Sequence, residues 1–143
     1  MEKNEKKIVK QFLNEIGVDF DEFMENYNNE NLDFEIGKHR FIYEGEIDDI
    51  QIKELESDPY ILGCFSSWAI ADASNLDYEI IEALQESEKF ELIGQYLINN
   101  NCLDELQRIC VANDGYGHHF AHYDNETLED ILCETGYYVF RVN

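Results

Sequence analysis

The most chemically versatile side chains of this sequence gather in a histidine-rich segment near its C-terminal end. Residues 115–124 read GYGHHFAHYD and include His118, His119 and His122, three of the four histidines in the chain. Imidazole and carboxylate ligands suit zinc or iron, so a metal site is one interpretation. The glycines and aromatic residues instead favour a loop and a strand over 118–123, on which His118 and His122 would stand about 13 Å apart. We therefore expect these rings to have a packing role and to bind no metal.

The sequence contains no other recognisable pattern of a catalytic or cofactor site. It has no GxSxG serine, phosphate-binding loop, dinucleotide glycine fingerprint or HExxH helix. The four cysteines form no CxxC pair and are typical of reduced, buried thiols in the cytosol: Cys64, Cys102, Cys110 and Cys133. We predict a non-enzymatic protein without a cofactor. A small metal enzyme built on the histidine segment remains the alternative from a different class.

Carboxylates are by far the most abundant functional groups of the chain. Its 143 residues include 32 Asp and Glu but only 10 Lys and Arg, a net charge of −22, whereas solubility needs a magnitude of only about 2–8. Like charges at helical spacing destabilise a helix by a few tenths of a kcal/mol per pair. We interpret the repeated or clustered carboxylates as partner-binding residues, which are Glu79, Glu82 and Glu86; Asp19, Glu22 and Glu25; Asp48 and Asp49; and Glu126, Glu129 and Asp130.

The amount of charge is comparable with that of a short piece of DNA. A compact chain of this length is about 35–40 Å across, and a duplex with one charge per ~1.7 Å carries about 22 charges over ~37 Å. The same excess of negative charge disfavours direct binding of nucleic acid or of an anionic membrane. We therefore predict a basic nucleic-acid-binding protein as the partner. An acidic surface that serves only solubility is the simpler alternative.

In size, composition and acidic runs, the chain resembles small acidic inhibitors of phages and mobile elements that mimic DNA, of the antirestriction and anti-CRISPR type. It also resembles, less closely, acidic immunity proteins that neutralise nuclease toxins. Both resemblances imply an inhibitor that occupies the nucleic-acid groove of an enzyme. No signature motif accompanies the resemblance, so it assigns no residue a role.

Hydrophobic periodicity predicts the elements that position these side chains. The 44% of apolar residues can form a core, and we expect one acidic globular domain, 1–143, with an α+β fold. The longest apolar runs fall short of the roughly 20 residues that span a bilayer, and no secretory signal is recognisable, so we expect a cytoplasmic protein. The expected elements are helices 5–16 and 19–27, a hairpin 32–43, a helical middle over about 58–112 with one buried helix over 60–73 and further helices over 75–86, 87–98 and 103–111, and strands 118–123 and 137–142.

The first predicted helix carries a stripe of lysines beside its apolar face. Lys3, Lys6, Lys7 and Lys10 recur at the spacing of one helical face and supply four of the ten basic residues. A solvated helix face is the plain interpretation. The stripe could instead contact the acidic surface of this chain or of a dimer mate, so a homodimer stays open.

Overall fold

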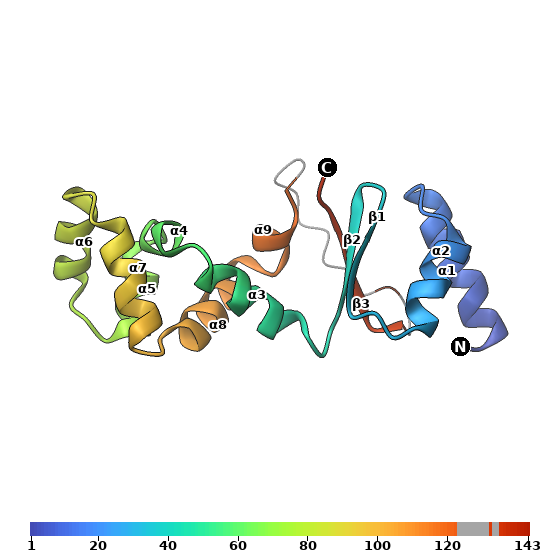
Figure 1. Ribbon diagram of the computed structural model, residues 1–143, viewed down its shortest axis with the longest axis horizontal. Coiled ribbons are helices and arrows are strands. Elements are labelled where there is room, and N and C mark those ends of the chain that lie inside the picture. Colours follow the sequence, from blue (N-terminus) through green and yellow to red (C-terminus); the bar gives the residue numbers. More distant parts are fainter. Residues whose placement is uncertain (123–131, 133–134) are drawn as a thin grey trace. The chain divides into compact units, whose positions relative to one another are not determined.

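The computed structural model describes residues 1–122, 132 and 135–143. The chain divides into two compact units: the flanking unit, Met1–Ile47 with Gly115–Asn143, and the central unit, Asp48–Asp114. The predicted α+β fold class is confirmed, with N-terminal helices, a helical middle and a small antiparallel sheet (Figure 1). The expectation of a single domain stays a prediction.

The flanking unit combines helices with a three-stranded antiparallel sheet in the order β1-β2-β3. The hairpin predicted over 32–43 is present, and its turn uses the left-handed φ of +60° at Gly37, which favours glycine. Strand 137–142 is also present and pairs with β2, so that Phe41 lies opposite Val139. The elements of this unit are α1 (Lys3–Glu15), α2 (Phe20–Asn28), β1 (Asp33–Ile36), β2 (His39–Tyr43), α9 (Gly117–Phe120) and β3 (Tyr137–Arg141).

The core of the flanking unit forms between α1, α2 and one face of the sheet. Alternation along each strand places Phe34, Phe41 and Val139 on this face. Val9 of α1 and Phe23 of α2 pack against it and are fully buried, as are Phe41 and Val139. Tight burial of this aromatic face fixes the register of the hairpin, because a slip of one residue would expose it.

The strand predicted over 118–123 is wrong, because Gly117–Phe120 forms the single turn α9. The turn buries the Phe120 ring on the other face of the sheet, where its centroid lies 5.1 Å from that of the Phe140 ring. The Arg40 guanidinium carbon lies over the Phe120 ring, 5.2 Å from the ring centroid. Beyond the turn, the His122 amide donates one hydrogen bond to the Arg141 carbonyl of β3 (3.1 Å). Burial of Phe120 therefore outweighs the extended conformation that the local sequence favours.

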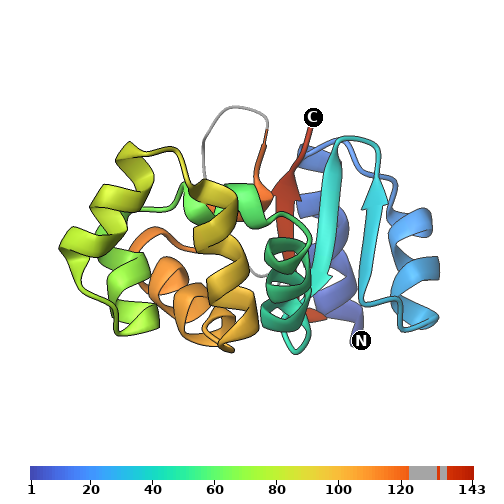
Figure 2. The ribbon, with the colours of Figure 1, turned by 60° about the vertical axis from the view of Figure 1, so that its left-hand side comes forward.

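The central unit is built of short helices, seen together in Figure 2. Helix α4 packs on α7, and α5 packs on α6 and α8. Leu62, Ile70, Leu97 and Leu106 are fully buried in its core. The elements are α3 (Ile47–Glu56), which begins at the last residue before this unit, α4 (Pro59–Gly63), α5 (Ser67–Ser74), α6 (Tyr78–Glu86), α7 (Phe90–Asn99) and α8 (Leu103–Asp114).

The single buried helix predicted over 60–73 is also wrong, because it breaks into α4 and α5. The start is as predicted: the Asp58 side chain caps α4 by accepting from the Ile61 amide (3.2 Å). At the break, the Gln85 side chain donates to the carbonyl oxygens of Gly63 (3.0 Å) and Phe65 (2.8 Å). These hydrogen bonds satisfy carbonyls that a continuous helix would have paired internally.

Candidate functional site

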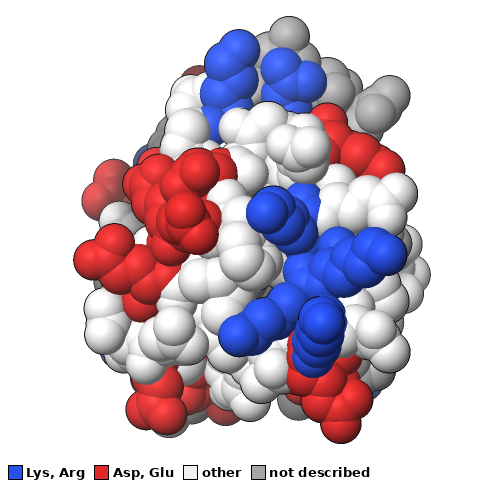
Figure 3. All heavy atoms as spheres, turned by 90° about the vertical axis from the view of Figure 1, so that its right-hand side faces the viewer, with Lys and Arg blue, Asp and Glu red and all other residues white. Residues whose placement is uncertain are grey.

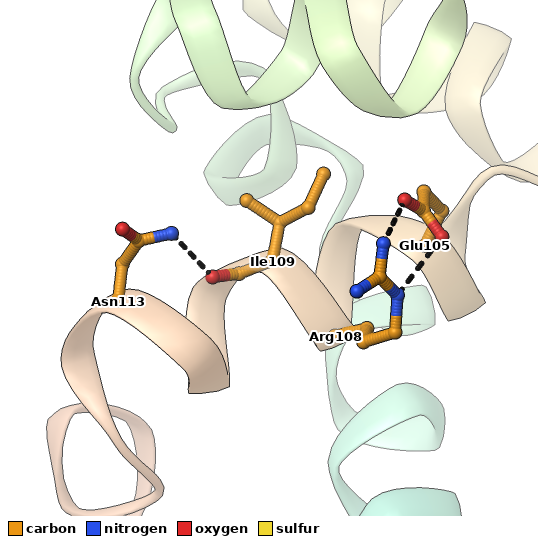
Figure 4. A network of polar contacts seen from close by, with 4 residues as sticks. All are labelled: Glu105, Arg108, Ile109 and Asn113. Atoms are coloured by element: carbon orange, nitrogen blue, oxygen red, sulfur yellow. Dashed lines mark hydrogen bonds and ion pairs between the residues drawn. The ribbon is translucent and has the colours of Figure 1, made fainter.

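The central unit carries −12 of the net charge of −22, because it holds few basic residues. Residues 48–114 include 15 acidic and 3 basic residues, and the basic ones are Lys53, Lys89 and Arg108. Figure 4 shows that the Arg108 guanidinium donates two hydrogen bonds to the Glu105 carboxylate on α8, from Nε to Oε2 (3.1 Å) and from Nη2 to Oε1. This hydrogen bonding lowers the pKa of Glu105 and raises the pKa of Arg108. One of the three cations is therefore already paired within its own helix.

The three predicted carboxylates of α6 do not share one fully exposed face. Glu79 and Glu86 are exposed, but Glu82 is half-buried. Ile80 is 48% exposed, although the helical period of the sequence predicts that it faces the core together with Ile81 and Leu84, so that prediction is wrong. The reason is that Gln85 turns inward to bond the carbonyls at the α4–α5 break, which centres the buried side of α6 between Ile81 and Gln85. Ile80 and Glu82 consequently flank the buried side.

Two of the other predicted carboxylates have local structural roles. Asp19 is the N-cap of α2 and accepts from the Glu22 amide (3.0 Å), and Asp48 in the first turn of α3 accepts from the Gln107 amide group (2.8 Å). Both remain exposed, as do Glu22, Glu25 and Asp49. The α2 group belongs to the flanking unit, whereas Asp48, Asp49 and the α6 carboxylates belong to the central unit. Glu126, Glu129 and Asp130 lie outside the described residues.

Exposed apolar side chains on the central unit are a feature that the sequence patterns did not predict. Its α4 and α7 helices each expose two of them, and Tyr60 of α4 stacks edge-on against Phe90 of α7 with ring centroids 5.4 Å apart. Aromatic residues and a polar rim are typical of protein interfaces. The exposed large apolar residues of this unit are Tyr60, Ile61, Trp68, Tyr78, Ile80, Leu92 and Tyr96. The available signal was the absence of any charged residue in the stretch 59–71.

A small open pocket lies within the central unit where α3 ends and α8 begins. Its volume is about 200 Å³, and its lining includes Ile52, Ile98 and Leu103 together with the carboxylates of Glu56 and Asp104. Pockets for cofactors and drug-sized ligands are generally larger, about 300–1,000 Å³. The pocket therefore does not indicate a cofactor site.

The three histidines of the histidine-rich segment lie in and just after the turn α9, and the described cysteines differ in exposure: Cys64 is exposed, against its predicted burial, whereas Cys102 is buried. His119 stacks edge-on against Phe120 at 4.6 Å, while His118 and His122 are exposed. Residues 1–122, 132 and 135–143 contain no group of three His, Cys, Asp or Glu side chains placed to hold a metal ion. Burial, with a smaller effect of the Asp114 charge, raises the pKa of Cys110 to about 11, so this thiol is protonated at neutral pH.

Across the described residues, every helix is too short or too polar to cross a lipid bilayer. Comparison with protein-family models, with curated proteins and with solved structures finds no match to this chain.

Proposed function

We propose that this protein is a non-enzymatic cytoplasmic inhibitor that binds a basic nucleic-acid-binding protein by presenting carboxylates where that protein expects phosphates. The observation that carries this proposal is the charge of the central unit, 15 acidic against 3 basic residues with Arg108 paired to Glu105. Such a field steers a basic partner and raises the association rate. The antirestriction and anti-CRISPR type of inhibitor is the version of this function that the composition favours.

The exposed apolar side chains support a protein partner rather than an acidic surface that serves only solubility. Trp68 is 46% exposed and Leu92 59% exposed, although exposed aromatic and aliphatic residues do nothing for solubility. They supply contact area once charge has brought the two proteins together. Carboxylates would then govern the association rate, and apolar contacts the lifetime of the complex.

The test begins with capture of basic proteins on immobilised wild-type protein at about 0.05 M salt, followed by elution at about 0.5 M. For each captured nucleic-acid-binding protein, association is measured with and without a competing DNA duplex. We expect fast, salt-sensitive binding that the duplex blocks. The proposal fails if the partner binds equally well at both salt concentrations while nucleic acid stays bound beside it.

Two matched charge reversals then locate the binding surface. Glu79→Lys/Glu86→Lys on α6 and Glu22→Lys/Glu25→Lys on α2 change the net charge equally and involve exposed side chains only. We expect the α6 variant to associate at least about tenfold more slowly at low salt than the α2 variant. Equal rates for the wild-type protein and the α6 variant would exclude this face. A captured nuclease toxin would identify the alternative, an immunity protein.

A further inference from the structure

A compact patch of positive charge lies on α1, in a chain that is otherwise acidic. Lys3, Lys6, Lys7 and Lys10 are all exposed, and Figure 3 shows Lys and Arg side chains gathered on this end of the flanking unit. Among the described residues, none of these four ammonium groups forms an ion pair. Lys10 instead lies 5.7 Å from the centroid of the Phe20 ring. We call these four lysines the α1 lysine patch.

Three of the carboxylates near the patch in sequence form hydrogen bonds that cap helices. Glu2 and Glu5 form a capping box at the start of α1, in which the Glu5 carboxylate accepts from the Glu2 amide (3.1 Å). Asp19 caps α2. Within the described residues of the flanking unit, no carboxylate forms an ion pair with the α1 lysine patch.

Charge complementarity decides between two kinds of occupant. A nucleic acid would satisfy the patch but would be repelled by the remaining carboxylates of the chain. A second copy offers both signs: its acidic surface faces the patch, and its own patch faces the acidic surface of the first copy. A two-fold symmetric contact makes each such interaction twice. Beyond about 8 Å at physiological salt, repulsion between the two acidic bodies is screened, so the local contacts dominate.

From this complementarity we propose that the α1 lysine patch binds the acidic central unit of a second copy of this chain, giving a reciprocal, salt-sensitive homodimer. The central unit is the chosen surface because it holds 15 acidic and only 3 basic residues. This dimer does not depend on the proposed inhibition, since it requires no third protein.

Sedimentation equilibrium on the full chain tests the association. We expect dimers at about 0.15 M salt and a more than tenfold weaker association at about 0.5 M. Lys6→Glu/Lys10→Glu should abolish the dimer. The matched control, Lys38→Glu/Lys53→Glu, has the same net charge and also replaces exposed lysines, and it should lose far less association. Circular dichroism confirms that each variant is folded, and Lys6→Gln/Lys10→Gln should weaken the dimer with a smaller change in charge.

Carbodiimide cross-linking of a mixture of isotopically light and heavy protein identifies the contacts. We expect bonds between chains that join the α1 lysine patch to Asp or Glu within 48–114. The proposal is overturned if the protein is monomeric at about 0.15 M salt, if the two charge-reversal variants behave alike, or if intermolecular bonds avoid the patch. It is equally overturned if the patch binds a DNA duplex and Lys6→Glu/Lys10→Glu removes that binding while self-association persists.

Discussion

Gly94→Ala should strongly destabilise the central unit, although alanine is the better helix former. A Cβ atom on Gly94 would lie 1.9 Å from the Pro59 carbonyl oxygen, 2.5 Å from its carbon and 2.7 Å from its Cα. Ordinary contact begins near 3.4 Å, so α4 and α7 would have to separate locally by about 1.5 Å. Because these atoms belong to the backbone, no side-chain rotation can relieve the overlap.

The loss in the free energy of unfolding follows from the buried side chains along the contact between α4 and α7. Leu62 of α4 and Leu97 of α7 are fully buried, and Ile93 nearly so. Gaps of 0.5–1 Å already forfeit a quarter to a half of the dispersion attraction, and overpacking alone costs about 1–3 kcal/mol. Because the overlap is with backbone atoms, we place the cost at or above the upper end of this range. After the gain of about 1 kcal/mol from helix propensity, we expect a net loss of at least about 2 kcal/mol.

Urea unfolding followed by the fluorescence of Trp68 measures this loss. Trp68 is the single tryptophan of the chain and lies in α5, so its signal reports on the central unit. With a slope of about 2 kcal/mol per M, the unfolding midpoint should fall by at least about 1 M. Gln95→Ala, at an exposed position next to Gly94, is the matched control and should change stability by less than about 0.5 kcal/mol.

Gly63 provides an independent check of the same contact. Its added Cβ would lie 1.9 Å from the Phe90 carbonyl oxygen, so Gly63→Ala should be similarly costly. The double variant should lose less than the two single losses together, because the first substitution already separates the helices. If Gly94→Ala is as stable as the wild-type protein, the close backbone approach is refuted, and with it the placement of α4 on α7.

Three further outcomes are expected. Gln85→Ala should cost about 1–3 kcal/mol, since two carbonyls at the α4–α5 break lose their donor, and urea unfolding beside Gln95→Ala measures it. Burial, and to a smaller extent the nearby Arg141 charge, lowers the pKa of His39 below 6.5, so the unfolded chain binds the proton more readily than the folded chain. The free energy of unfolding of the wild-type protein should therefore rise with pH between that lowered pKa and about 6.5. Unfolding measured at about pH 5 and 7.5 should show this rise for the wild-type protein but not for His39→Gln. Iodoacetamide at about pH 8 should modify Cys110 much more slowly than the exposed Cys64, because the pKa of Cys110 is raised to about 11. Peptide mass spectrometry measures the two rates, and equal rates would contradict the burial of Cys110.

Local signals in the sequence were sufficient where one residue type fixes the backbone. Asp58 and Pro59 predict the start of α4, because a side-chain acceptor and a preset φ favour the first turn of a helix. Gly37 predicts the hairpin turn through its left-handed φ. Together with the hydrophobic periods, these signals predict the α+β class. The charge excess, which underlies the proposed function, also needs no structure.

Tertiary contacts decided what those periods could not. The sequence did not predict helix α3, because the polar Gln51 interrupts the apolar period between Ile47 and Leu55. Gln51 is nevertheless buried, and its side-chain oxygen accepts a hydrogen bond from the Gln107 side chain (3.0 Å). A distant partner made the polar residue compatible with burial, and nothing within the helix indicates that partner.

The candidate binding surface shows the same division. Composition determined that carboxylates dominate, but only packing decided which of them are free: Asp19 and Asp48 accept hydrogen bonds, and Glu82 is half-buried. Packing likewise exposed Ile80 when Gln85 turned toward the break between α4 and α5. Charge is a property of the residues themselves, whereas exposure depends on which partners the rest of the chain brings to them.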